Sequence, residues 1–276
     1  MKVSLTATPS RKQSGPILFW GSVARAFSLA AQLGYDGVEL HLRHPDEIDR
    51  DEVKNLTVEY SLGIPTLGTG MAAGEEGLTF ADLDPDIRRQ AVDRVKGQID
   101  LAAHLGSAVT IGSLSGRLGG TPEQRPTRRE AALACLKECC HTAALAGVTI
   151  FLEPLNRYEC DYLNTLEEGL AVIRQIGMSN VKLLADTFHM NIEEVDIGAS
   201  LRRAGPDLGH VHLCDSNRQA PGNGHLNFRD VLEALRDIEY QGYVSFEVLP
   251  LPNSRKAAQG AIRYVKGILS SLPVDV

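Results

Sequence analysis

Four acidic or histidine side chains stand at the ends of successive apolar segments in the second half of this 276-residue sequence. They are Glu153 in "VTIFLEP", Asp186 in "VKLLADT", His212 in "GHVHLCD" and Glu247 in "YVSFEVL". Each is followed by the next after about one strand and one helix, so adjacent parallel strands would bring all four to one level. This mixed oxygen and nitrogen ligand set suits Mn2+, Mg2+ or Co2+ better than an ion that prefers thiolates.

The charges of these four residues favour the same interpretation. Three carboxylates buried near one another would repel and take up protons, whereas a divalent cation between them offsets the repulsion and keeps them ionised. Any one of the four could instead be an ordinary polar end of a strand. Four of them on successive strands favour a metal site.

Three further polar side chains follow these ligands closely in the sequence. His189 comes three residues after Asp186, and we expect it in the loop above the ligands, donating to a bound oxygen; a helix-capping role is the alternative. Arg218 begins a glycine-rich loop, and its fork of donors suits a carbonyl, enolate or carboxylate oxygen, although a surface ion pair is as common. Glu159 could accept from a substrate hydroxyl or be a solvated loop residue.

Other histidines have weaker support as site residues. His210 shares a strand face with His212 one layer lower, and we interpret it as a hydrogen-bonded core histidine. Glu39 and His41 share a face at the end of the segment 37–42, where they could help to shape a pocket. We leave His225 outside the core site, because its "PGNGH" context is that of a flexible turn.

The elements that must position these residues alternate between short apolar segments and longer amphipathic ones, which is typical of repeated β-α units. Eight strands are predicted, at residues 3–8, 37–42, 64–70, 108–114, 148–154, 181–187, 209–215 and 243–249. Helices are expected to end at left-handed glycines before several of these strands: Gly34, Gly63, Gly106, Gly147 and Gly177. Eight units without a linker predict one (β/α)8 TIM barrel domain over residues 1–276, with its site at the carboxyl ends of the strands.

Composition excludes several classes of function. The net charge of -7 and the absence of a basic run argue against a nucleic-acid partner. No apolar run reaches the roughly 20 residues that span a membrane, and the N-terminal segment does not resemble a signal peptide, so we expect a cytoplasmic protein. Neither nucleotide-binding glycine motif is present. The five cysteines favour core packing over a disulfide framework or a metal cluster.

The motifs "EPLNRYE", "LLADTFHMNIEE", "HVHLCDSNR" and "SFEVLPLP" resemble those of the metal-dependent ketose 3-epimerases, which belong to the xylose isomerase-like barrels. The resemblance extends over nearly the whole chain and implies that Glu153, Asp186, His212 and Glu247 bind the metal, with Mn2+ the first expectation. It also implies that the two glutamates are the acid and base of an enediolate mechanism. The residues implied to contact the substrate are Glu159, His189 and Arg218.

The loops "DSNRQAPGNGHLNF" and "GTGMAAGEEGLTF" most resemble those of 5-keto-L-gluconate epimerases, which invert the carbon beside the ketone of a keto-hexonate. Such a substrate requires a second cation, for which Arg117 and His225 are the candidates. The alternatives are a D-allulose or D-tagatose 3-epimerase acting on free ketohexoses, a hydroxypyruvate-type aldose-ketose isomerase, an endonuclease-like relative, and a non-enzymatic sugar-binding barrel. We expect a homodimer or homotetramer with a small-molecule ketose or keto-hexonate as its partner.

Overall fold

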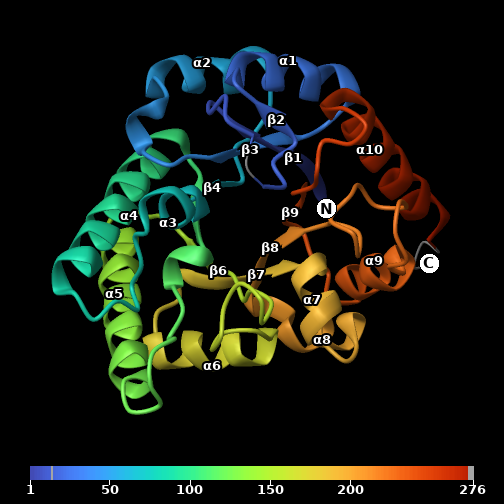
Figure 1. Cartoon of the computed structure of the whole chain (residues 1–276). Coiled ribbons are helices and arrows are strands. Elements are labelled where there is room, and N and C mark those ends of the chain that lie inside the picture. Colours follow the sequence, from blue (N-terminus) through green and yellow to red (C-terminus); the bar gives the residue numbers. More distant parts are fainter. Residues whose placement is uncertain (14, 273–276) are drawn as a thin grey trace.

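The computed structural model describes residues 1–13 and 15–272, in which parallel strands form one closed sheet with helices around it (Figure 1). The strands are β1 (Lys2–Thr8), β2 (Phe19–Trp20), β3 (Gly37–His41), β4 (Thr66–Gly68), β5 (Ala108–Ile111), β6 (Ile150–Leu152), β7 (Val181–Asp186), β8 (Leu208–His212) and β9 (Tyr243–Phe246). Pairing of β1 with both β3 and β9 closes eight strands into a barrel, and β2 pairs with β1 beside it. The predicted (β/α)8 barrel is confirmed.

Most of the helices form an outer ring around the barrel in chain order, and the short helices α3 and α7 lie inside that ring in the view of Figure 1. The helices are α1 (Val23–Leu33), α2 (Arg50–Tyr60), α3 (Gly70–Glu76), α4 (Pro85–Leu105), α5 (Arg125–Leu145), α6 (Leu166–Ile176), α7 (Thr187–Glu193), α8 (Ile197–Ala204), α9 (Phe228–Asp237) and α10 (Ser254–Ser271). Short 3-10 turns lie at Pro45–Glu47, Ser113–Ser115 and Gly205–Asp207. No helix in the described ranges is long and apolar enough to cross a membrane.

Local sequence explains where many of these helices begin and end. Asp84 accepts from the backbone of Asp86 and precedes Pro85, which favours the first turn of α4. Left-handed glycines end α1, α4 and α6 as predicted, with φ of 78° at Gly34, 73° at Gly106 and 72° at Gly177. Gly147, with φ of 68°, lies one residue beyond the C-cap of α5.

The prediction that Gly63 caps a helix is wrong, because α2 ends at Tyr60 and its C-cap is Ser61, which itself adopts the left-handed conformation. Gly63 is required for a different reason. A β-carbon there would collide with the hydroxyl of Tyr243, which begins the closing strand β9. The strand pair β1–β2 was also not predicted, since β2 has only two residues.

An irregularity between β7 and β8 sets the level of the site residues. The register shifts after the pair Leu183 and Leu208, so that Leu184 pairs with His210 and Asp186 with His212. The extra residue is Gly209, where a β-carbon would lie 2.8 Å from that of Lys182. This shift brings His212, rather than Val211, level with Asp186 at the end of the strands.

The core lies both inside the barrel and between its strands and helices. Its largest fully buried side chains include Phe27, Phe80, Phe228 and Phe246. The five cysteines are buried free thiols, three of them on the inner side of α5, in agreement with a packing role. Polar residues also lie buried in the barrel strands, among them Glu39 in β3, Thr66 in β4 and His210 in β8.

A candidate metal centre at the carboxyl rim of the barrel

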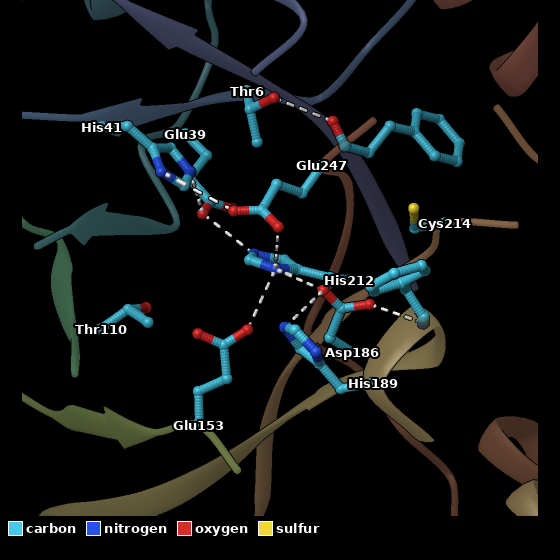
Figure 2. Close-up of polar contacts among 12 residues, drawn as sticks. Thr6, Glu39, His41, Thr110, Glu153, Asp186, His189, His212, Cys214 and Glu247 are labelled. Atoms are coloured by element: carbon cyan, nitrogen blue, oxygen red, sulfur yellow. Dashed lines mark hydrogen bonds and ion pairs between the residues drawn. The ribbon is translucent and has the colours of Figure 1, made fainter. Parts of the chain in front are cut away.

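The four predicted ligands gather at the carboxyl ends of β6 to β9 (Figure 2). Asp186 and His212 are the last residues of their strands, whereas Glu153 and Glu247 lie one residue beyond theirs. The backbone N–H of Glu153 still donates to the carbonyl of Ile111 on β5 at 3.0 Å, and the next residue, Pro154, has no N–H to continue the pattern. The carboxylates therefore project from the rim toward a common point.

The distances at this point leave room for a cation. His212 Nδ1 lies 3.7 Å from Glu153 Oε1, 3.8 Å from Asp186 Oδ2 and 3.8 Å from Glu247 Oε2. Within the described residues, His212 Nδ1 and Asp186 Oδ2 are buried without a hydrogen-bond partner. Ligand atoms that each lie about 2.0–2.6 Å from a shared cation are separated by distances of this size. The arrangement therefore fits a divalent cation.

A second acidic and histidine cluster shares His212 but has different geometry. Glu39 Oε1 lies 3.0 Å from His212 Nε2, and Glu39 Oε2 lies 2.8 Å from His210 Nε2. These are direct hydrogen bonds, and they leave no space for an ion between the atoms. A cation therefore fits on the side of His212 that faces Glu153 and Asp186, and not between His212 and Glu39.

Burial and charge act against each other at the metal centre. Burial raises the pKa of Glu153 well above its usual range, and the neighbouring Glu247 and Asp186 add to the effect. Burial opposes ionisation of Asp186 too, but His189, His212 and Arg218 outweigh it and lower that pKa to about 2. A divalent cation among these groups would favour the ionised form of every carboxylate.

His189 lies next to the metal centre but belongs to helix α7, not to a loop as predicted, because Asp186 Oδ1 caps this helix by accepting from Phe188 N. His189 Nδ1 accepts from the backbone N–H of Asn156 at 3.2 Å and lies 2.7 Å from its side-chain amide. In the neutral imidazole the proton is then on Nε2, which lies 3.8 Å from Asp186 Oδ2. His189 therefore presents a donor to the site.

Arg218 is fixed over the same cavity by two carboxylates and an aromatic ring. Its guanidinium donates to Glu159 Oε1 at 3.0 Å and to Glu247 Oε2 at 3.3 Å, and it lies 4.5 Å from the centre of the Phe188 ring. Its backbone is left-handed, with φ of 61°. Asp215 holds the surrounding loop, since its carboxylate accepts from backbone N–H groups on both sides of Arg218.

Sequence reasoning missed the supporting residues Asn156 and Asp215. Asn156 lies inside the quoted motif "EPLNRYE", but nothing in its spacing predicts that it would orient His189. Asp215 opens the loop after β8, and an aspartate before a glycine-rich loop is a turn signal that we could have used.

A cavity of about 60 Å³ opens above the metal centre, and Glu153, His189, His212, Arg218, Glu247 and Glu159 contribute to its wall. Gly112 lies against Glu153 and Gly68 against His41, where a β-carbon would collide with either side chain. The two candidates for a second cation lie elsewhere in the described structure. Arg117 is exposed and donates to the carbonyl of Tyr158, and His225 is exposed beside Ser216.

Comparison with known proteins identifies the family. Residues 27–267 match the model of the xylose isomerase-like TIM barrel. L-ribulose 3-epimerase of Methylomonas sp. (strain DH-1) is 32% identical over 249 residues, which cover 87% of this chain and 86% of the relative. D-psicose 3-epimerase of Ruminiclostridium cellulolyticum is 36% identical over 225 residues, which cover 79% of this chain and 75% of the relative.

The fold of this chain is also similar to that of a solved structure. The crystal structure of D-allulose 3-epimerase from Methylomonas sp. in complex with D-allulose superposes with a TM-score of 0.80 at 28% identity. The superposition covers 96% of this chain and 97% of that chain. The chain thus belongs to the xylose isomerase-like TIM barrel family, among the ketose 3-epimerases, and is an isomerase.

Proposed function

We propose that this chain is a divalent metal-dependent epimerase that inverts the carbon beside the ketone of a ketose or keto-hexonate. The observation that carries the proposal is the placing of two glutamates around one centre. Glu153 and Glu247 lie on opposite sides of His212 in Figure 2, and each has a carboxylate oxygen 3.7–3.8 Å from His212 Nδ1. Inversion requires a proton-transferring group on each face of the substrate carbon, and this pair supplies both.

Glu153, Asp186, His212 and Glu247 would hold the cation, and Mn2+ is the first candidate, with Mg2+ and Co2+ next. When bound, the cation supplies Lewis acidity that lowers the cost of negative charge on the substrate oxygens. A glutamate can use one carboxylate oxygen as a ligand and keep the other for proton transfer. The largely buried setting of Glu153 limits the access of water that would compete for that proton.

The proton balance of one turnover involves only these two glutamates. One carboxylate removes the proton from the substrate carbon, and the electron pair of the broken C–H bond moves into the adjoining carbonyl group. The other glutamate, which enters the step protonated, then delivers its proton to the opposite face of the same carbon. The enzyme ends with the proton on the first glutamate and is ready for the reverse reaction, or for exchange with solvent.

His189, Arg218 and Glu159 would orient the substrate oxygens. The Nε2–H of His189 and the guanidinium of Arg218 are preorganised donors, since Asn156 fixes the first and Glu159 with Glu247 fixes the second. Donors held in place before the reaction stabilise developing negative charge without the cost of reorganisation. Glu159 also offers its second oxygen to a substrate hydroxyl.

Two candidate substrates differ in the group at the end of the sugar far from the reacting carbon: it is neutral in a ketohexose and a carboxylate in a keto-hexonate. Among the described residues, Arg218 is the only arginine or lysine that lines the cavity, and two carboxylates already engage it, which favours a neutral ketohexose. The solved relative binds D-allulose, a sugar of this class. The loops after β4 and β8 resemble those of keto-hexonate epimerases, and this resemblance favours the acid, with Arg117 as its partner.

A substrate panel tests both candidates. D-allulose, D-tagatose and 5-keto-L-gluconate are incubated with the Mn2+-loaded protein, and NMR follows inversion beside the ketone. We expect turnover of the neutral ketohexoses with the higher kcat/KM. A higher kcat/KM for 5-keto-L-gluconate would instead identify the keto-hexonate as the substrate. In that case Arg117→Ala should lower this kcat/KM by roughly ten- to a hundredfold. No inversion of any of the three sugars would reject the function.

A further inference from the structure

The buried carboxylate of Glu39 is the meeting point of three imidazoles from two strands. Glu39 lies on β3 and is fully buried in the barrel interior. Its Oε1 lies 2.9 Å from His41 Nε2 and 3.0 Å from His212 Nε2, and its Oε2 lies 2.8 Å from His210 Nε2. Figure 2 shows Glu39 beyond His212, on the side away from Glu153 and Asp186.

This contact determines the chemical form of His212. A buried carboxylate accepts hydrogen bonds and has none to donate, so each nitrogen that faces Glu39 must carry a proton. Neutral imidazole has a single N–H, and in His212 that hydrogen is therefore on Nε2. The lone pair is left on Nδ1, the atom that faces the three carboxylates of the metal centre at 3.7–3.8 Å.

We propose that Glu39 is a positioning residue that holds His212 with Nε2 protonated and Nδ1 free to bind the cation. The inference rests on the metal-dependent function proposed above. The opposite tautomer would direct a lone pair at the Glu39 carboxylate and an N–H at the cation, and both contacts are repulsive. A hydrogen-bonded carboxylate also makes a ligating imidazole more basic, which strengthens its bond to a metal.

His210 and His41 keep the Glu39 carboxylate in this orientation. The His210 ring stacks on Phe151 of β6, with centroids 5.5 Å apart and planes within 5° of parallel. Since His210 occupies Oε2, the other carboxylate oxygen is turned toward His212 and His41. His41 Nδ1 in turn lies 3.9 Å from Glu247 Oε1. The Glu39 carboxylate therefore contacts His212 directly and is connected to Glu247 through His41.

The test compares Glu39→Gln with a matched control, Thr66→Val. Glutamine keeps the size of the side chain and can still accept from two imidazoles through its oxygen, but it lacks the charge. Thr66 is also fully buried in the barrel, and its hydroxyl bonds that of Thr110 at 2.8 Å, so Thr66→Val removes a buried hydrogen bond in which neither Glu39 nor His212 takes part. Mn2+ affinity is measured by titration with detection of free Mn2+ by electron paramagnetic resonance.

We expect Glu39→Gln to raise the Kd for Mn2+ by about 10- to 100-fold and Thr66→Val to leave it within about threefold of wild type. Unchanged Mn2+ affinity in a folded Glu39→Gln protein would overturn the inference while leaving the metal-dependent function intact. Failure of the wild-type protein to bind Mn2+ would overturn both.

A spectroscopic measurement tests the same inference without any variant. In the Mg2+-loaded wild-type protein, long-range proton–nitrogen correlation spectra distinguish the two tautomers of His212. We expect the proton on Nε2, with Nδ1 lacking one. A proton on Nδ1 of His212 would contradict the proposed role of Glu39, whether or not the substituted protein folds.

Discussion

The two glutamates at the metal centre lie in unlike surroundings. Glu247 is held by charged and polar neighbours, since Arg218 donates to its Oε2 at 3.3 Å and His41 Nδ1 lies 3.9 Å from its Oε1. Glu153 projects over Gly112, and within the described residues its carboxylate accepts no hydrogen bond. Its pKa is raised, chiefly by burial.

The difference teaches that the two faces of the proposed site are not equivalent. Arg218 restrains Glu247 through a hydrogen bond, whereas the buried surroundings of Glu153 raise its pKa and favour a proton until a cation is present. The two sides share His212, Asp186 and the proposed cation. Substitutions on either side, and at the shared ligands, should therefore have distinguishable effects.

The largest effect is expected from Glu153→Gln and Glu247→Gln. Each should abolish inversion, with a loss of at least about 10²- to 10⁴-fold in kcat, because one face of the substrate carbon loses its proton donor or acceptor. The remaining glutamate can still remove a proton and return one to the same face. Each variant should therefore exchange solvent deuterium into one epimer only, and the two variants should select opposite epimers in NMR spectra.

Two results would contradict this assignment. Inversion at a wild-type rate in either variant would exclude that glutamate as an acid or base. Exchange into the same epimer by both variants would show that the two carboxylates do not serve opposite faces.

Next in size is the loss of a ligand common to both sides. Asp186→Asn should raise the Kd for Mn2+ by at least about 100-fold, since it removes a charge from a buried ligand atom that lacks a hydrogen-bond partner among the described residues. Chelation of the wild-type metal should lower stability by about 2.7 kcal/mol relative to Mn2+ at 100 times its Kd. Calorimetric titration and thermal unfolding measure the two effects, and unchanged Mn2+ affinity in the variant would remove Asp186 from the ligand set.

A moderate effect is expected on the Glu247 side alone. Arg218→Lys keeps the charge but cannot bridge Glu159 and Glu247 with one planar group, so we expect kcat/KM to fall roughly ten- to a hundredfold. The control is Arg157→Lys, which replaces an exposed arginine that pairs with the largely buried carboxylate of Glu193 at 2.9 Å. Equal losses in both variants would indicate that the bridge made by Arg218 has no special role.

The smallest effect concerns the loops above the two glutamates. Asp161 binds the loop on the Glu153 side by accepting from Leu118 N and Gly119 N, and Asp215 binds the loop on the Glu247 side. Burial alone would raise the pKa of each carboxyl, but Arg125 with backbone N–H groups lowers that of Asp161, and backbone N–H groups lower that of Asp215.

A lowered folded-state pKa gives stability that is present above the unfolded pKa of about 3.9 and is lost as the pH falls through the folded value. Asp161→Asn and Asp215→Asn should each lower the free energy of unfolding by about 1–3 kcal/mol at pH 7. The difference from wild type should shrink below about pH 4. Urea unfolding across this pH range measures it, and a difference that does not depend on pH would rule out the carboxylate charge as its cause.

The sequence was sufficient to predict the barrel and the meeting of its four rim residues, because strand and helix periodicity and the spacing of strand ends are local signals. His189 was predicted near Asp186, but its helix was not, since capping by Asp186 replaces the expected loop. The contact of Glu39 with His212 joins residues 173 positions apart, and no local pattern predicts such a pairing. The bulge at Gly209 and the loop anchor Asp215 depend likewise on neighbours that only the folded chain supplies.

The strand that closes the barrel also positions the last of the proposed metal ligands. β9 pairs with β8 on one side and with β1 on the other, and Glu247 directly follows it. During synthesis Glu153, Asp186 and His212 leave the ribosome seconds before Glu247, at roughly 5–20 residues per second. Until β9 docks, the sheet has two open edges and the proposed metal site lacks its fourth ligand. Metal binding at that site would therefore favour joining of the first and last strands, and we expect the supply of metal during translation to influence how quickly the nascent barrel closes.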